Sequence, residues 1–325
     1  MKTFAAALLL GAASAVTTSE LSYMNHLAKF GRAIASAEEF DMRHARFQEV
    51  DEFIRESNAV EKNFTLGHNQ FSDYTREEYG KMLGLRHADM RHENVSVMNA
   101  VTVPDSVNWV ELGGVTPVKD QGQCGSCWSF STTGAMEGSH FVATGDLLSF
   151  SEQQLVDCST LNLGCNGGNP LWAYRYLKSH YAELESVYPY VSGTTMTAGT
   201  CQYDSMSKTA VEVQDSASVT PNSPSQMKAH LAQQPLAVLV EADTYIFQSY
   251  TSGVLDSTRC GTSLDHAVLA VGYGTDEASG LDYWLVKNSW NTTWGDQGYI
   301  KLAMTTEGDD GICGVQMGPT FPTAN

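Results

Sequence analysis

Basic residues are scarce in this chain of 325 residues, in which 19 lysines and arginines stand against 37 aspartates and glutamates. The formal net charge of −18 at pH 7 repels phosphate groups, which argues against nucleic acid or an anionic membrane as the main partner. From Val103 onward there are 8 basic and 23 acidic residues, and before it 11 and 14. Most of the negative charge therefore belongs to the C-terminal part of the chain.

The chain also lacks internal repeats and, beyond its first residues, low-complexity stretches and long apolar runs. Residues 1–15 contain one lysine, a short apolar run and the ending Ala13-Ser14-Ala15, the pattern of a secretory signal peptide. This run is too short to span a bilayer. We therefore expect no membrane span and folding in the oxidising secretory pathway, with lysosome, vacuole and extracellular space as open destinations. Candidate glycosylation sites, each in an N-x-[ST] sequence, are Asn63, Asn94 and Asn291.

Cysteines are odd in number, at positions 124, 127, 158, 165, 201, 260 and 313. Cys124 and Cys127 form a C-x-x-C pair, but zinc needs a second pair at similar spacing, and positions 158 and 165 lie too far apart. A tryptophan directly after the pair also fits a zinc site or a thioredoxin-like redox pair poorly. We expect no metal and no organic cofactor. An odd cysteine in a secreted chain indicates one free thiol, and six further cysteines allow 15 pairings.

Cys127 is the candidate nucleophile. A turn of glycines and a serine leads into it and an apolar stripe follows, so it is expected at the start of a helix. Because a helix N-terminus favours an anion, we expect a lowered Cys127 pKa and a nucleophilic thiolate near or below neutral pH.

The spacing of apolar residues predicts helices early in the chain and strands late. Phe40, Phe47 and Ile54 recur every seven residues and predict one helical face within residues 19–58. Helical signals also dominate from residue 115 to 211. Strands are predicted at residues 237–240, 267–271, 283–286 and 299–302. The pattern indicates an α+β fold, with a helical half, a β half and a cleft between them.

Three motifs resemble those of papain-like cysteine peptidases of the cathepsin L-like subgroup. Cys124-Gly-Ser-Cys127-Trp128 matches the active-site pattern C-G-[SA]-C-[WY] at every position. Upstream, two sets of residues are similar to the propeptide motifs of that subgroup. These are Glu39, Arg43, Phe47, Ile54 and Asn58, and then Gly67, Asn69, Phe71 and Asp73. Val50 stands where the first motif usually has asparagine, from which we expect the loss of one hydrogen bond and not of the fold.

The resemblance implies a preproenzyme with a papain-like two-domain fold, in which a helical left domain and a β-barrel-like right domain follow a helical inhibitory prodomain. The implied units are a signal peptide at 1–15, a propeptide at 16–102 and a peptidase domain at 103–325, mainly helical over about 103–211 and mainly β over 212–325. The polar residues 86–102 would be a linker cut near Val103. The implied disulfides are Cys124–Cys165, Cys158–Cys201 and Cys260–Cys313.

The propeptide is expected to run backwards through the cleft and to inhibit the enzyme. Asp73 is a hypothetical acid sensor, because protonating a paired carboxylate removes its stabilising interaction.

The resemblance further implies four catalytic residues. Cys127 and His266 would form a thiolate–imidazolium pair. Asn288 would accept the histidine N–H and orient the ring, and Trp290 would shield that bond from water. The Gln121 side chain and the Cys127 backbone N–H would form the oxyanion hole.

Motif position assigns substrate binding to Gly167, Gly168, Asn169, Pro170, Ala267 and Gly318 as well as Trp290. Gly168 would pair with an extended substrate, since glycine permits the close approach. Gly318 lies where some relatives carry an acid, so bulky apolar side chains are expected at P2, the residue two before the cut. A glycan on Asn291 could crowd the cleft rim.

These residues predict a cysteine endopeptidase acting on proteins and peptides, with its own propeptide and cystatin-type proteins as candidate inhibitors. The alternatives are an exopeptidase of the same family, an inactive peptide-binding homologue, and a free prosegment-like inhibitor, against which the complete catalytic half argues.

Overall fold

The structure is a computed structural model that describes residues 16–86, 94–98, 102–205 and 208–325. The expected signal peptide at 1–15 and part of the expected linker at 86–102 lie outside the described residues. Within the described part of the chain, no helix is long and apolar enough to cross a membrane.

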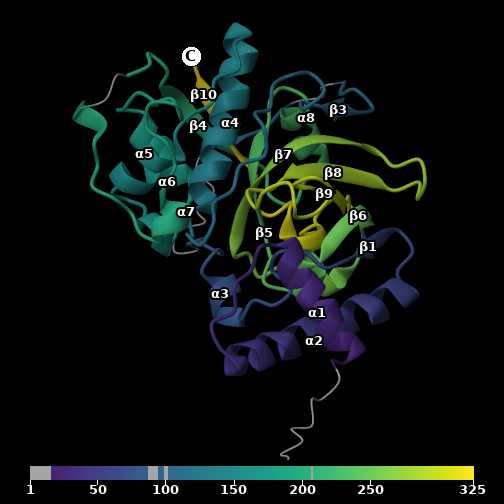
Figure 1. Ribbon diagram of the computed structural model, residues 1–325. Helices are drawn as coiled ribbons and strands as arrows, with labels where there is room; N and C mark the ends of the chain where they lie inside the picture. The colour runs from purple at the N-terminus through teal and green to yellow at the C-terminus, as the bar shows by residue number, and fades with distance from the viewer. Residues whose placement is uncertain (1–15, 87–93, 99–101, 206–207) are drawn as a thin grey trace, which may run out of the picture.

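The N-terminal segment, defined as the described residues before Val103, begins with two helices on one side of the molecule (Figure 1). α1 (Thr18–Lys29) starts at a capping box on Thr17, and α2 (Ala37–Val60) starts at Ser36, whose hydroxyl accepts a backbone N–H. The helical region predicted as one stretch is thus two helices. The reason is Gly31, which follows α1 with a positive φ of 62° and turns the chain. A third short helix, α3 (Arg76–Gly80), follows.

Helices form one lobe of the molecule, which includes the longest helix after Val103 (Figure 1). They are α4 (Cys127–Thr144), α5 (Glu152–Cys158), α6 (Pro170–Leu177) and α7 (Ser192–Thr195), with 3₁₀ turns η1 (Gly164–Asn166) and η2 (Tyr203–Ser205). Disulfides join Cys124 to Cys165 and Cys158 to Cys201 in this lobe, and Cys260 to Cys313 in the other. These are the three pairings that the family resemblance implies.

A ten-stranded sheet forms the other lobe, in the order β1-β6-β9-β8-β7-β5-β10-β4-β2, with β3 paired to β7. The strands are β1 (Phe64–Leu66), β2 (Val95–Ser96), β3 (Val107–Asn108), β4 (Val213–Val219), β5 (Leu236–Val240), β6 (Tyr250–Leu255), β7 (His266–Thr275), β8 (Asp282–Lys287), β9 (Tyr299–Ala303) and β10 (Thr320–Ala324). Their connections contain α8 (Pro224–Leu231), α9 (Tyr245–Gln248), η3 (Thr258–Cys260) and η4 (Ile312–Gly314). The N-terminal segment supplies both terminal strands, since β1 pairs with β6 and β2 pairs with β4.

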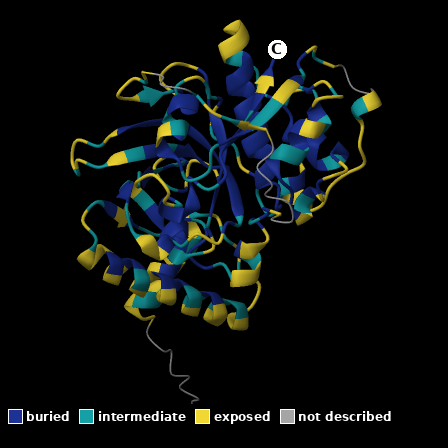
Figure 2. Ribbon diagram, turned by 180° about the vertical axis from the view of Figure 1, so that it is seen from behind, coloured by how far each residue is buried: buried dark blue, intermediate teal, exposed yellow. Residues whose placement is uncertain are grey.

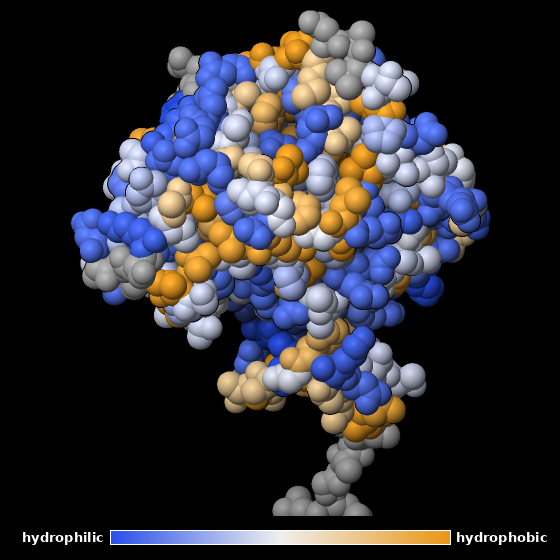
Figure 3. Space-filling view, turned by 90° about the horizontal axis from the view of Figure 1, so that it is seen from above, coloured by the Kyte–Doolittle hydropathy of each residue, from blue (hydrophilic) through white to orange (hydrophobic). Residues whose placement is uncertain are grey.

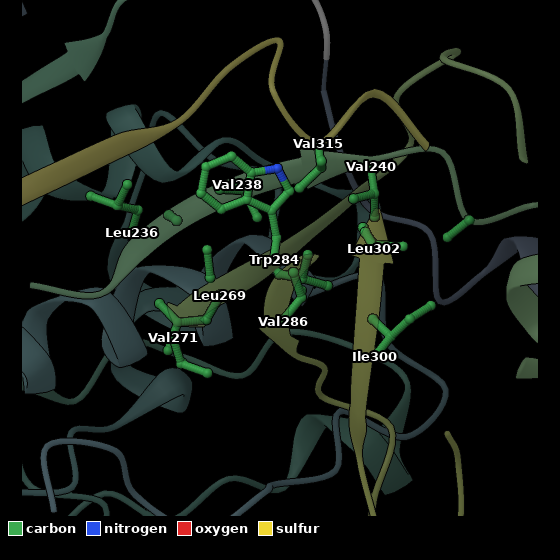
Figure 4. Close-up of a cluster of buried hydrophobic side chains, with 14 of the residues drawn as sticks. Leu236, Val238, Val240, Leu269, Val271, Trp284, Val286, Ile300, Leu302 and Val315 are labelled. Atoms are coloured by element: carbon green, nitrogen blue, oxygen red, sulfur yellow. The ribbon is translucent and has the colours of Figure 1, made fainter. Parts of the chain in front are cut away.

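Apolar side chains of the central strands form the core of this lobe (Figure 4). Trp284 of β8 is fully buried and lies among side chains of neighbouring strands. β7 reads as an almost unbroken apolar run because all of its residues except the last are buried. The labelled core residues around Trp284 are Leu236, Val238, Val240, Leu269, Val271, Val286, Ile300, Leu302 and Val315.

α4 packs against β7 and joins the two lobes. It is buried from Cys127 to His140, and only its last turn reaches the surface (Figure 2). Two glycines permit the close packing: a Cβ on Gly134 would lie 2.8 Å from Leu269 Cδ2, and one on Gly138 would lie 2.5 Å from Pro235. Cys127 begins α4 and His266 begins β7, so this packing brings the ends of the two elements together.

Candidate active site

Cys127 is the first residue of α4, is fully buried, and is the cysteine that the three disulfides leave free. The free thiol therefore lies at a helix N-terminus, as the sequence predicts. Its surroundings come from both lobes and from the N-terminal segment, because Leu85, Leu239, Leu264 and Ala267 pack with it in one apolar cluster.

The His266 ring is held by Asn288 and covered by Trp290. Nε2 of His266 lies 2.8 Å from Oδ1 of Asn288, and since an amide oxygen only accepts, Nε2 carries the proton. The indole of Trp290 stacks on the imidazole with ring centroids 4.6 Å apart. The Nδ1 atom is buried without a hydrogen-bond partner among the described residues. Asn288 thus fixes the tautomer that leaves Nδ1 available as a base.

The Gln121 amide has one defined orientation. Its Oε1 accepts from Ser289 Oγ at 2.7 Å and from Trp290 Nε1 at 3.1 Å. Two donors on one oxygen leave Nε2 as the group that faces the other way, where it donates to Met82 O and to Cys124 O, both at 2.8 Å. In this form both N–H groups of Gln121 are therefore bonded, and the one that bonds Met82 O would be freed by removal of the N-terminal segment.

A buried charge network lies behind Asn288 and ties β8 to the helical lobe. The Nζ of Lys287 donates to Thr116 O at 2.8 Å, and the Thr116 hydroxyl donates to Glu137 at 2.7 Å. Lys119 bridges Glu137 and Glu152 on the same side. Lys119 thus pairs with two carboxylates, while Lys287 is held by the neutral oxygens of Thr116, and these bonds tie the strand end that carries Asn288 to the helical lobe.

The N-terminal segment passes through the cleft in extended form. Leu85 pairs in parallel with Gly168: Gly168 N donates to Gly84 O at 2.8 Å and Arg86 N donates to Gly168 O at 2.9 Å. On the other wall, Leu85 N donates to Asp265 O at 3.0 Å. The backbone of the N-terminal segment is therefore hydrogen-bonded to both lobes.

Gly84 is the point of closest approach. A Cβ built on this residue would lie 1.9 Å from Gly125 O, in the turn that leads into Cys127. Main chain meets main chain at this place, and no flexible side chain could move aside. Only glycine fits.

Burial in this form shifts the pKa values of the candidate catalytic pair. Burial raises the pKa of the Cys127 thiol to about 11, and backbone hydrogen bonds of Ala267, Gly84 and Trp128 offset this only in part. Burial also lowers the pKa of His266 to about 4, against the effect of its bond to Asn288. The expectation of a low Cys127 pKa is therefore wrong for this form, and the thiolate–imidazolium pair stays a prediction for the form without the N-terminal segment. Removing water from the site penalises the charged form of each group, and the hydrogen bonds that favour the Cys127 thiolate and the His266 imidazolium do not compensate.

The glycines assigned to substrate binding are needed for close packing. A Cβ on Gly168 would lie 2.6 Å from the Trp128 ring, and Gly167 has a positive φ of 104° and faces Gly84 O. Asn169 is only 3 % exposed, and its side chain accepts from Leu171 N at 2.9 Å as the cap of α6. Pro170 is buried as the first residue of that helix. Asn169 therefore serves the fold of the cleft wall.

An apolar pocket beside Cys127 holds the Leu85 side chain. Leu239, Leu264 and Ala267 line it, and half-buried Met317 flanks it. Sequence reasoning identified Ala267 and missed the other three. A signal existed for two of them, since Leu264 precedes His266 by two residues and Met317 adjoins Gly318. Gly318 itself is buried behind Leu239, whose Cδ1 would lie 3.1 Å from a Cβ on that glycine.

The first propeptide-like motif holds α2 to α3 and β1. Arg43 is 9 % exposed and binds both carboxylate oxygens of Glu78, at 2.9 and 2.6 Å, as well as Glu39 at 2.8 Å. The Asn58 side chain bonds both the N–H and the C=O of Leu66, each at 2.9 Å. The apolar members Phe47 and Ile54 are buried, and so is Val50 at the position that departs from the motif.

The second motif anchors the N-terminal segment on the sheet lobe. Asn69 Nδ2 donates to Gln248 O at 2.6 Å, and Phe71 packs edge-on against Trp290 with ring centroids 5.4 Å apart. Gly67 lies close to Thr251, with 2.9 Å from a built Cβ to its Cγ2. The segment therefore covers the tryptophan that also covers His266.

Asp73 is fully buried, accepts from Tyr23 at 3.1 Å and lies 3.4 Å from Arg32. Burial raises its pKa, and Arg32, Tyr23 and Arg43 offset this only in part. A carboxyl whose pKa is raised on folding loses stability as pH rises, not as it falls. The direction of this shift therefore contradicts the acid-sensor hypothesis for Asp73.

The three glycosylation candidates differ in their surroundings. Asn63 is half-buried and its Nδ2 donates to Asp256 at 2.5 Å, so a glycan would cost that bond. Asn94 and Asn291 are exposed, both with positive φ, and Asn291 makes a 3.3 Å bond to Asp120. In the described part of the chain, no group of three or more His, Cys, Asp or Glu side chains could hold a metal ion.

Comparison with known proteins agrees with this site. Residues 103–323 match the profile described as papain family cysteine protease. The chain belongs to the papain family. Residues 23–79 of the protease match the cathepsin propeptide inhibitor domain, so the full chain is a zymogen, and the N-terminal segment is hereafter called the prosegment.

The protease is similar to plant and animal relatives over most of its length. It is 43 % identical over 294 residues to the probable cysteine protease RD21B of Arabidopsis thaliana, covering 87 % of this chain and 61 % of that one. It is 41 % identical over 322 residues to digestive cysteine proteinase 2 of Homarus americanus, covering 94 % and 96 %. A solved recombinant stem bromelain precursor matches with a TM-score of 0.86 and 33 % identity, over 94 % of this chain and 99 % of that one. The chain thus spans about three-fifths of the first relative's length.

Proposed function

We propose that the mature protein is a cysteine endopeptidase, and that Cys127, His266, Asn288 and Gln121 carry the reaction. The observation that carries this proposal is the fixed Gln121 amide, whose Nε2 donates to Met82 O of the prosegment and to Cys124 O, three residues before a buried free thiol at a helix start. After the prosegment leaves, water returns to the cleft and the charged thiolate–imidazolium pair becomes accessible.

In the proposed reaction, the Cys127 thiolate attacks the carbonyl carbon of the scissile peptide bond. The carbonyl π electrons move to oxygen, and Gln121 Nε2 and the Cys127 backbone N–H stabilise that oxyanion. The oxyanion collapses, the C–N bond breaks, and the His266 imidazolium gives its proton to the leaving amine. His266 then removes a proton from water, which attacks the thioester and releases the acid and the thiolate.

We propose that P2, the residue two before the cut, is bulky and apolar. In support, Leu85 fills a pocket of Leu239, Leu264 and Ala267 next to Cys127. That cluster contains no charged group, so an arginine would enter without a partner, which is costly.

We also propose the routes by which the protein is made and controlled. The composition of residues 1–15 supports entry into the secretory pathway, with a lysosome, vacuole or the outside as destination, and exposed Asn94 and Asn291 support glycosylation. The propeptide boundary is proposed near Val103, where the match to the papain family begins. Cystatin-type inhibitors are proposed to enter the same cleft as the prosegment.

Acid release of the prosegment is proposed to depend on His26 in place of Asp73. His26 is 5 % exposed between α1 and α2, with ring centroids 5.0 Å from Phe47 and 6.1 Å from His68, and its Nε2 has no hydrogen-bond partner among the described residues. Burial lowers its pKa to about 4, and the nearby cations His68, Arg32 and Lys29 act in the same direction. Below about pH 6.5, His26 binds a proton in the unfolded chain but not in the folded chain. The free energy of unfolding of the prosegment therefore decreases as the pH is lowered from about 6.5 to about 4.

Replacing His26 with phenylalanine should flatten this dependence. From the pKa values, wild type loses about 2 kcal/mol of prosegment stability between pH 7 and pH 5, and the variant should lose much less. Hydrogen exchange of α1 and α2 amides in full-length zymogen, corrected for intrinsic rates, measures this loss. His180→Phe, in the peptidase domain, is the control. Equal pH dependence in H26F and wild type would show that another group senses acid.

The proposed function is tested with acid-treated zymogen and two end-blocked peptide substrates that differ only in leucine or arginine at P2. We expect hydrolysis of the leucine substrate at least about tenfold faster. An epoxide that alkylates thiolates should abolish hydrolysis, and mass spectrometry should find the label on Cys127.

Three other outcomes would each contradict one part of the proposed function: the endopeptidase activity, the catalytic activity itself, or the P2 preference. Processed enzyme that labels at Cys127 but spares every blocked substrate would be an exopeptidase. Processed protein that neither labels nor cleaves would be an inactive homologue. A preference for arginine would overturn the assignment of the P2 pocket.

A further inference from the structure

The outer edge of β4 binds an extended peptide by its main chain. β2, residues 95 and 96 of the predicted linker, pairs in parallel with β4, with Val95 opposite Ser218 and Ser96 opposite Val219. The sheet order ends at β2, so β4 has a free edge once the prosegment is gone. Free N–H and C=O groups along such an edge can pair with another strand.

Two side chains of α8 also bind residues 94–98, one at Met98 beyond the end of β2 and one at Ser96 within it. Gln226 Oε1 accepts from Met98 N at 2.8 Å, and its Nε2 donates to Met98 O at 3.0 Å. The amide of Gln226 thus bonds both main-chain groups of one residue, as a neighbouring strand would. It selects an extended backbone and no particular side chain.

His230, one turn further along α8, forms a hydrogen bond with a hydroxyl group. Its Nδ1 lies 2.8 Å from the carbonyl oxygen of Gln226, which only accepts, so Nδ1 carries the proton and Nε2 accepts from Ser96 Oγ at 3.0 Å. His230 is 2 % exposed and packs against Phe321. By contrast, the flanking Val95 and Val97 are 44 % and 58 % exposed. Recognition therefore rests on backbone and on one small hydroxyl side chain.

This edge is distinct from an apolar docking surface. Seen from above, the surface of the molecule mixes hydrophobic and hydrophilic residues (Figure 3). The polar groups of β4, Gln226 and His230 are already matched to a peptide, and none of them belongs to the proposed catalytic group.

We propose that the β4 edge with Gln226 and His230 is an exosite of the mature enzyme that binds extended polypeptide substrates carrying serine or threonine at the position of Ser96. In the zymogen, residues 94–98 fill the exosite and hold the prosegment at a second place outside the cleft. A substrate bound there is kept near the enzyme between cuts. The proposal rests on the proposed function, because it needs the prosegment to be removed.

The test is a titration of a fluorescent peptide of residues 94–98 with mature enzyme whose cleft is blocked by the epoxide. We expect saturable binding in fluorescence anisotropy, weakened about tenfold by Gln226→Ala in the enzyme or by Ser96→Ala in the peptide. Gln233→Ala is the matched control, since Gln233 is exposed just after α8 and should leave binding unchanged.

No saturable binding, or equal affinity for Gln226→Ala and wild type, would overturn the exosite. Hydrolysis of the blocked substrate is measured separately on the same preparation. If hydrolysis fails, the peptide is titrated without the epoxide, so that binding tests the exosite and hydrolysis tests the proposed function.

Discussion

Replacing Gln121 with alanine is expected to lower kcat of the processed enzyme by about 10²–10³-fold, equal to roughly 3–4 kcal/mol of transition-state stabilisation. The physical reason lies in the two bonds on Oε1 from Ser289 and Trp290, which fix Nε2 toward the cleft before any substrate arrives. A donor fixed in advance needs no reorganisation when charge develops on the substrate oxygen. The measurement is steady-state hydrolysis of the blocked leucine substrate, with active sites counted by thiol titration.

Gln123→Ala is the matched control for this variant. Gln123 lies two residues further along the same turn and is half-buried, and its backbone N–H bonds Gly193 O at 3.0 Å, which alanine retains. We expect its kcat within about twofold of wild type. Should Q121A retain more than a third of wild-type kcat while folding normally, Gln121 would not be an oxyanion donor and the mechanism would need another.

Replacing Gly84 with alanine is expected to loosen the prosegment while leaving the peptidase domain intact. The new Cβ would lie 1.9 Å from Gly125 O, so the two backbones must separate. Overpacking of this kind costs about 2–3 kcal/mol, which raises the open fraction of the zymogen about 30- to 150-fold. The rate at which the epoxide labels Cys127 in uncleaved zymogen at pH 7 reports that fraction.

The neighbouring Gly80 provides the control for Gly84. A Cβ at Gly80, the last residue of α3, meets nothing within 4 Å. Labelling of Gly80→Ala should therefore match wild type. If G84A also labels at the wild-type rate, the close approach at Gly84 does not contribute to latency.

The sequence predicts the parts of the site that depend on residue type and order. Cys127, His266, Asn288 and Gln121 are each brought to the cleft by the start or end of an element or by the turn before it, and the motifs mark those places. The disulfide pairing followed from the same resemblance and matches the structure. Local chemistry explains the split of the first helical region as well, because Gly31 and Ser36 were visible as stop and start signals.

Properties that depend on another part of the chain could not be predicted from local sequence. Burial raises the Cys127 pKa, and Leu85, which packs against Cys127, lies 42 residues before it, so nothing around Cys127 in the sequence indicates that contact. The same holds for Leu239, whose side chain reaches the pocket through the pairing of β5 with Ala267 on β7. β2 is two residues long, too short for a periodic pattern, and its partners β4, Gln226 and His230 lie more than 100 residues further along the chain.

The buried, neutral state of Cys127 also bears on how the chain acquires its disulfides. Thiol–disulfide exchange and oxidation by peroxide both need a thiolate, and a thiol with a pKa near 11 and no exposed surface supplies almost none at neutral pH. In this form the seventh cysteine is thereby protected chemically from exchange with the three disulfides of the other six. The same uncovering that is proposed to make the sulfur a nucleophile would also expose it to oxidants.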